Sequence, residues 1–136
     1  MKEMTPNELI EYSNKNKCIL IDVRTDREWE TVGKPDGDHV GLKTYFVSIK
    51  DNEGSLNGNF VNDILSLNIE KGLEIAFICK SGARSALASD MLSHENYKCI
   101  NVIDGFEGNK GWLNSCLLYT SPSPRDQRGS GMPCCA

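Results

Sequence analysis

The feature that most constrains the fold of this chain is a short apolar run, residues 75–78, that ends abruptly at Cys79. The run is rich in β-branched and aromatic residues and barely alternates, which is typical of a parallel strand buried on both faces. A loop that contains Gly82 follows, and residues 85–94 predict a helix. A buried strand, a short loop and a helix in this order favour an α/β fold.

The rest of the chain continues the alternation of strands and helices. Thr5 and Glu8, and again Thr25 and Glu28, have the spacing of a capping box, which marks the start of a helix. We expect one α/β domain over residues 1–115, with a mainly parallel sheet covered on both faces by helices. Besides the helix at 85–94, we expect helices at 6–14 and 60–67 and a short helix that begins near Thr25. Besides the strand at 73–78, we expect strands at 19–23, 45–49 and 99–103.

Cys79 is the leading candidate for a functional residue. The carboxyl ends of parallel strands are where α/β proteins bind ligands. Free N–H groups of the loop and of the first helical turn should stabilise a thiolate there. The alternative is a small apolar residue at the end of a core strand, because free cysteine is often buried. A turn-forming glycine and the two cations Lys80 and Arg84 favour the functional interpretation.

Three segments resemble the rhodanese family of sulfurtransferases. Residues 79–85, Cys-Lys-Ser-Gly-Ala-Arg-Ser, look like its active-site loop. Residues 21–24, followed by Glu28 and Trp29, resemble its early strand and helix, and residues 101–106 with Trp112 resemble its closing segment. The similarity covers about residues 4–115 in the right order. It implies a single-domain member with the family's three-layer α/β fold.

The resemblance implies that Cys79 is a nucleophile that carries sulfur as a persulfide. The implied partners are a small sulfur donor such as thiosulfate and a cyanide or thiol acceptor, with a protein acceptor also open. We expect no cofactor, and no metal either, because only Cys134 and Cys135, in the suspected tail, approach the spacing of a zinc site. The implied supporting residues are Asp22 and Arg24, which brace the site. The implied substrate-binding residues are Lys80, Ser81, Gly82, Ala83, Arg84 and Ser85.

Other activities remain open at this stage. Cys79 and Arg84 form a Cys-x4-Arg loop, whereas relatives that handle phosphate or arsenate carry Cys-x5-Arg, so a phosphatase or arsenate reductase is disfavoured. A sulfur carrier or regulatory module without turnover is the main alternative. Residues 33–38 depart from the family's pattern and put the shape of one pocket wall in question, and residues 105–108 are expected at the rim of the site.

Charge and the remaining reactive residues narrow the functional classes. Residues 1–115 carry 13 Lys and Arg against 18 Asp and Glu, an excess of five negative charges that argues against nucleic acid as a partner. We expect His39 and His94 on the surface, and Cys18 and Cys99 as core thiols, which fits a reducing cytoplasm. Neither a signal segment nor a membrane-spanning run is evident, so no membrane partner is expected.

Residues 116–136 resemble a sequencing-library adapter translated in frame. The transposon end of such adapters encodes Cys-Leu-Leu-Tyr-Thr-Ser, as found at 116–121, and the primer site that follows encodes Pro-Ser-Pro-Arg-Asp, as found at 122–126. The alternative is a natural flexible tail rich in Ser, Pro and Arg. We therefore treat 116–136 as a non-native, disordered tail and set it apart from the expected domain.

Overall fold

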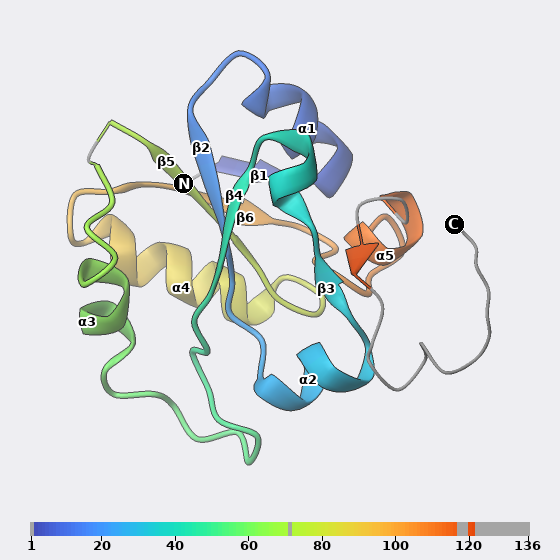
Figure 1. Ribbon diagram of the computed structural model, residues 1–136. Helices are drawn as coiled ribbons and strands as arrows, with labels where there is room; N and C mark the ends of the chain where they lie inside the picture. Colours follow the sequence, from blue (N-terminus) through green and yellow to red (C-terminus); the bar gives the residue numbers. More distant parts are fainter. Residues whose placement is uncertain (1, 71, 117–119, 122–136) are drawn as a thin grey trace.

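The computed structural model describes residues 2–70, 72–116 and 120–121. Its centre is a five-stranded sheet in the order β1-β6-β5-β2-β4, with every neighbouring pair parallel (Figure 1). A separate two-stranded antiparallel pair joins β3 and β7. The strands are β1 (Lys2–Met4), β2 (Cys18–Asp22), β3 (Lys34–Pro35), β4 (Lys43–Phe46), β5 (Glu74–Ile78), β6 (Lys98–Val102) and β7 (Thr120–Ser121).

Helices cover both faces of the sheet, as predicted. One face of the sheet packs against α3 and α4, and the other against α1 and α5. β5 lies in the middle of the sheet and is buried along its whole length, which explains its unbroken apolar run. The helices are α1 (Pro6–Ser13), α2 (Asp26–Thr31), α3 (Phe60–Leu65), α4 (Ala83–Ser93), α5 (Trp112–Ser115) and the 3₁₀ helix η1 (Gly37–Val40).

Both predicted capping boxes are present. The hydroxyl of Thr5 accepts the N–H of Glu8, and the Glu8 carboxylate accepts the N–H of Thr5. Thr25 and Glu28 make the same reciprocal pair of bonds. Each box satisfies N–H groups that the first turn of a helix leaves without intrahelical partners, and it thereby fixes where α1 and α2 begin.

Several predicted boundaries shift by one or two residues, and three differences from the prediction need a physical explanation. The sequence analysis predicted no strand before the first helix, but β1 precedes α1 and pairs with β6. The strand expected at 45–49 is β4, which ends at Phe46, because Val47 and Ile49 leave the ladder while their N–H groups still bond to carbonyls at the end of β2. The helix expected from Ser85 begins at Ala83, since Gly82 adopts φ +115° and forms the N-cap.

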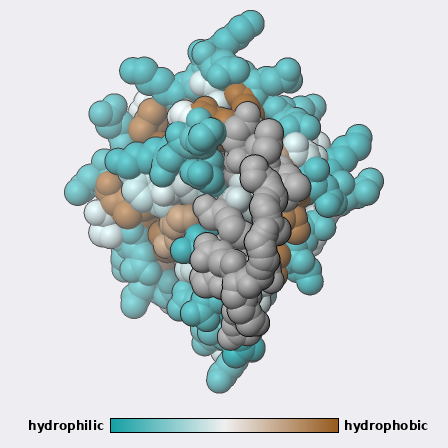
Figure 2. Space-filling model, turned by 45° about the vertical axis from the view of Figure 1, so that its right-hand side comes forward, coloured by the Kyte–Doolittle hydropathy of each residue, from teal (hydrophilic) through white to brown (hydrophobic). Residues whose placement is uncertain are grey.

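The described surface can be seen on one face of the molecule in Figure 2. On the face drawn in Figure 2, polar residues dominate the described surface and hydrophobic residues form small patches between them. Among the residues that the structure describes, the exposed large hydrophobic side chains are Phe46, Leu56, Leu65 and Leu87. Among the described residues, no helix is long and apolar enough to cross a membrane.

Candidate active site

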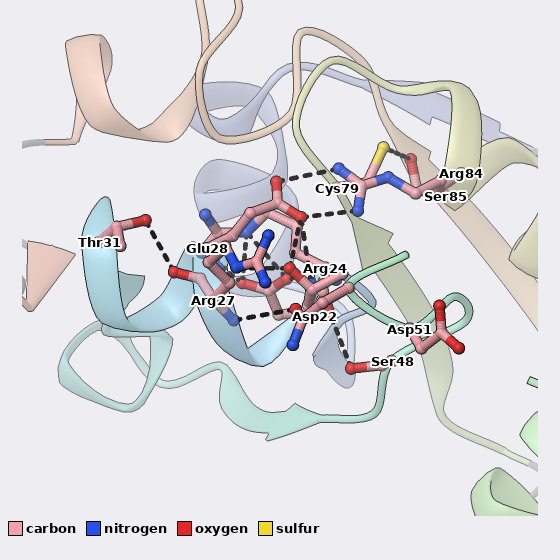
Figure 3. A network of polar contacts seen from close by, with 12 residues as sticks. Asp22, Arg24, Arg27, Glu28, Thr31, Ser48, Asp51, Cys79, Arg84 and Ser85 are labelled. Atoms are coloured by element: carbon pink, nitrogen blue, oxygen red, sulfur yellow. Dashed lines mark hydrogen bonds and ion pairs between the residues drawn. The ribbon is translucent and has the colours of Figure 1, made fainter. Parts of the chain in front are cut away.

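Cys79 follows the last residue of β5 at the carboxyl edge of the sheet, and its side chain is 1% exposed. Its sulfur accepts the backbone N–H of Gly82 at 3.1 Å. The same sulfur lies 3.3 Å from the hydroxyl of Ser85, as Figure 3 shows. The Gly82 N–H donates to the sulfur, and the Ser85 hydroxyl can either donate to it or accept from it. Donors directed at the sulfur stabilise negative charge there. The structure therefore gives Cys79 specific polar contacts that a merely space-filling thiol would not need.

The tight turn between β5 and α4 creates these contacts. Gly82 is buried and left-handed, with φ +115°. A residue with a Cβ atom rarely adopts that angle, so glycine is required for the turn. The turn brings the Gly82 N–H back onto the sulfur of the residue three positions earlier, and α4 starts at the next residue. The eleven-residue helix α4 thus directs its N-terminal end toward Cys79.

A second turn, after β6, holds the cysteine loop from behind. The N–H of Phe106 donates to the carbonyl of Cys79 at 2.7 Å, and the N–H of Glu107 donates to the carbonyl of Lys80 at 2.9 Å. Gly105 has φ +47°, and a Cβ atom built on it would lie 2.3 Å from the Cys79 carbonyl oxygen. The turn 105–107 therefore binds the carbonyls of Cys79 and Lys80 on the outer side of the cysteine loop. On the inner side, the Gly82 N–H points at the sulfur.

Arg84 is held by an ion pair with Glu28 of α2. Its two terminal nitrogens lie 2.7 and 3.0 Å from the two carboxylate oxygens, and both side chains are 20% exposed (Figure 3). Such a bidentate pair has the planar geometry that guanidinium and carboxylate groups favour. Because Glu28 balances its charge, Arg84 contributes less free positive charge to the loop than the sequence indicated. The sequence analysis named Glu28 as part of a capping box and of the segment that resembles the family, but it did not predict its ion pair with Arg84.

The ion pair shifts the protonation of both partners. Burial alone would raise the pKa of Glu28, but the hydrogen bonds from Arg84 and Thr25, together with the charge of Arg84, lower it from 4.5 to about 2. The same hydrogen bonds with Glu28 raise the pKa of Arg84 above its ordinary value. The pair is therefore fully ionised at neutral pH, and it ties α2 to the first turn of α4.

Asp22 and Arg24 form a fully buried pair beside the site. Arg24 Nε and Nη2 donate to the Asp22 carboxylate at 2.8–3.1 Å, and Nη2 also donates to the carbonyl of Gly33 at 2.8 Å. The guanidinium carbon lies 4.1 Å from the centre of the Phe106 ring. Since the N–H of Phe106 binds the Cys79 carbonyl, the Asp22–Arg24 pair packs against the turn that supports the cysteine loop.

The other predicted loop residues are placed as follows. Lys80, Ser81 and Ala83 are exposed at the rim, whereas Ser85 is completely buried. Within the described part of the chain, Lys80 makes no ion pair, so its charge is available at the mouth of the site. His39 and His94 are exposed, as predicted.

Cys18 and Cys99 are free, buried core thiols, as predicted. Burial raises the pKa of Cys18 to about 11 and also raises that of Cys99. Both thiols therefore stay protonated at neutral pH and are weak nucleophiles. They lie in different hydrophobic clusters on opposite faces of the sheet, at the end away from Cys79. Neither Cys18 nor Cys99 therefore lies beside Cys79.

Three residues of the suspected tail fall within the described part of the chain. Cys116 is 3% exposed in the cluster that contains Trp112, and its sulfur lies 3.4 Å from the Asn7 side-chain oxygen. Thr120 and Ser121 form β7. The remainder of the segment, residues 117–119 and 122–136, lies outside the described residues, and its origin stays a prediction.

A cavity of about 400 Å³ opens beside the site, between the start of α2 and the loop 51–58. Its lining includes Thr25 and Ser48, and the Ser48 hydroxyl donates to the carbonyl of Arg24. No residue of the cysteine loop lines this cavity, so the cavity is separate from the polar contacts of Cys79. Among the described residues, no group of three or more His, Cys, Asp and Glu side chains is arranged to hold a metal ion.

Comparison with known sequences identifies the family. A model of the rhodanese-like domain matches residues 5–114. The uncharacterised protein RP600 of Rickettsia prowazekii is 43% identical over 109 residues, which cover 76% of this chain and 84% of that protein. The chloroplastic rhodanese-like domain-containing protein 4 of Arabidopsis thaliana is 26% identical over 121 residues, which cover 88% of this chain and 26% of that protein.

Solved structures agree with this assignment. The crystal structure of Rv0390 from M. tuberculosis superposes with a TM-score of 0.70 and 32% identity, covering 80% of this chain and 82% of the other. A rhodanese-like domain protein from Staphylococcus aureus shares the fold, with a TM-score of 0.58 and 23% identity over 79% of this chain and 90% of that chain. The chain therefore belongs to the rhodanese-like domain family.

Proposed function

We propose that this protein is a sulfurtransferase that moves a sulfane sulfur from a donor such as thiosulfate to a thiophilic acceptor through a persulfide on Cys79. The observation that carries the proposal is the placement of the Cys79 sulfur, which lies 3.1 Å from the Gly82 N–H and 3.3 Å from the Ser85 hydroxyl at the end of the central strand. These polar contacts can stabilise negative charge on the sulfur during the reaction.

The reaction proceeds in two displacement steps. In the first, the Cys79 thiolate attacks the outer sulfur of thiosulfate, the sulfur–sulfur bond of the donor breaks, and sulfite leaves with the bonding electron pair. In the second, cyanide or a thiolate attacks the outer sulfur of the persulfide, and Cys79 leaves as the thiolate. Neither step needs an external oxidant or a general base, and the covalent intermediate predicts ping-pong kinetics.

The loop supports both steps by stabilising charge on sulfur. Hydrogen donors that are already oriented in the free protein stabilise developing negative charge without reorganisation, as in an oxyanion hole. The turn 105–107 supplies this preorganisation, because it binds the carbonyls of Cys79 and Lys80 on the outer side of the loop. The exposed Lys80 favours an anionic sulfur donor. The next residue is the uncharged Ser81 and not a second cation, so the loop does not distinguish between thiosulfate and mercaptopyruvate as the donor.

The alternative is a sulfur carrier or regulatory module that accepts sulfur on Cys79 without turning over small molecules. The observation that favours this alternative is that Cys79 is only 1% exposed. Steady-state formation of thiocyanate from thiosulfate and cyanide distinguishes the two functions. An enzyme shows many turnovers that Cys79→Ser abolishes and Cys18→Ser leaves intact, whereas a carrier stops after one sulfur per chain.

A further inference from the structure

A chain of three buried polar side chains links the candidate nucleophile to β6. The Cys79 sulfur lies 3.3 Å from the Ser85 hydroxyl, which lies 2.5 Å from the Asn101 side-chain oxygen. Asn101 is 4% exposed and Ser85 is fully buried. Asparagine is disfavoured in strands, and the neighbours of Asn101 in β6 are the buried Ile100 and Val102. A buried amide in this strand therefore needs a reason beyond packing.

The Ser85 hydroxyl has a single hydrogen, so it can donate to only one of its neighbours at a time. It has three neighbouring acceptors: the Asn101 oxygen, the Gly82 carbonyl at 3.1 Å and the Cys79 sulfur. When Cys79 is a thiol, its S–H donates to Ser85, and Ser85 donates to Asn101. When Cys79 is a thiolate, Ser85 must turn its hydrogen to the sulfur. Two bare oxygens would then face each other at 2.5 Å, which is unfavourable.

We propose that Asn101 is a positioning residue that switches the Ser85 hydroxyl toward the sulfur when Cys79 is ionised or carries a persulfide. Rotation of the amide by half a turn presents an N–H of Asn101 to Ser85 in place of the oxygen. Ser85 then accepts from Asn101 and donates to the sulfur. Asparagine suits both states because its side chain carries a donor and an acceptor on the same carbon. The role rests on the proposed function, in which the thiolate is the attacking species.

The charged groups on the elements around Cys79 take no part in the hydrogen bonds that link Cys79, Ser85 and Asn101. Of the hydrogen bonds described for Ser85 and Asn101, none involves a charged side chain. A neutral change at Asn101 therefore leaves the surrounding charges in place. These charges come from the loop, α4, α2, the end of β2 and the turn after β6, and belong to Lys80, Arg84, Glu28, Asp22, Arg24, Asp104 and Glu107.

The test is the alkylation rate of Cys79 with iodoacetamide at neutral pH, followed by peptide mass spectrometry. Asn101→Asp keeps the acceptor and removes the donor, so it holds the Ser85 hydrogen away from the sulfur. We expect alkylation to slow by about tenfold, the effect of one hydrogen bond to a charged group, and its pH profile to move to higher pH. Ser89→Ala is the matched control, because Ser89 is also buried on α4 but bonds to the carbonyl of Ile100.

A double-mutant cycle separates this role from simple repulsion by the new carboxylate. In a Ser85→Ala background, Asn101→Asp should change the alkylation rate by less than about twofold, since the coupling passes through Ser85. Asn101→Leu tests the same coupling without a charge if the Asp variant fails to fold: it removes the acceptor that competes for the Ser85 hydrogen, so alkylation should not slow, and a tenfold slowing in Asn101→Leu would overturn the proposal. A native alkylation rate in Asn101→Asp, or an equal effect in both backgrounds, overturns the proposal. Alkylation needs no sulfur donor, so this result is independent of whether the protein transfers sulfur.

Discussion

Replacement of Glu28 by glutamine isolates the contribution of the ion pair that ties α2 to α4. The difference between the ordinary pKa of 4.5 and the value of about 2 in the folded chain corresponds to about 3 kcal/mol of stability at neutral pH. Both side chains are 20% exposed, so water screens part of this energy. Glutamine keeps an acceptor for the capping box and for Arg84, so we expect Glu28→Gln to lower the free energy of unfolding by about 2 kcal/mol at pH 7.

The sign of the pH dependence follows from the direction of the pKa shift. A carboxyl group with a lowered pKa in the folded state stabilises the fold above its unfolded pKa, and this stability is lost as the pH falls toward the folded pKa. The native chain should therefore lose the Glu28 contribution progressively between pH 4.5 and about 2. Glu28→Gln has no such group, so the difference between the two proteins should narrow over that range.

Urea denaturation at a series of pH values measures both effects. Glu11→Gln is the control, since Glu11 is an exposed carboxylate on α1, and we expect it to change the stability by less than about 0.5 kcal/mol. Equal stability of native and Glu28→Gln proteins at pH 7 would refute the reasoning. So would a loss of stability that stays constant as the pH falls, because it would trace the effect to packing and not to ionisation.

Three further predictions concern the cysteine loop and the domain boundary. Gly105→Ala should lower the free energy of unfolding, measured in urea, by about 2 kcal/mol or more, because the new Cβ atom would meet the Cys79 carbonyl. Gly54 is the control: it also has a positive φ but open space around it, so Gly54→Ala should lower the free energy of unfolding by only about 1 kcal/mol. A glycine inserted between Gly82 and Ala83 should weaken sulfur transfer and permit oxyanion binding; appreciable aryl phosphatase turnover by the uninserted chain would show that loop length is the wrong discriminator. Truncation after Cys116 should leave the melting temperature unchanged, because a two-residue pairing of β7 with β3 adds little, and a drop of several degrees would show that the segment beyond it supports the fold.

Local sequence signals predicted the framework of the site. The apolar run of β5 located the central strand and the cysteine at its end, and the two capping boxes located the starts of α1 and α2. These features depend on neighbouring residues, so they can be read from a short window of sequence. The predicted helices on both faces follow from the same alternation.

Contacts between distant segments were beyond the same reasoning. Glu28 and Arg84 are 56 residues apart, and only the fold brings their side chains together. The coupling of Asn101 to Ser85 likewise joins β6 to α4. β1 was missed because its exposed residues carry no apolar pattern and the strand forms by backbone pairing with β6. The apolar Val47 and Ile49 extended the predicted β4 because they pack in the core without belonging to the strand ladder.

The most direct test of the central claim is the intact mass of the protein after incubation with thiosulfate and removal of the excess. The proposed persulfide adds one sulfur atom, about 32 Da, which cyanide or a thiol removes again. Peptide mapping should place the sulfur on Cys79, and Cys79→Ser should gain none, while Cys18→Ser and Cys99→Ser should gain it normally. Persistence of the added sulfur in Cys79→Ser, or its location on Cys18 or Cys99, would contradict the proposed function.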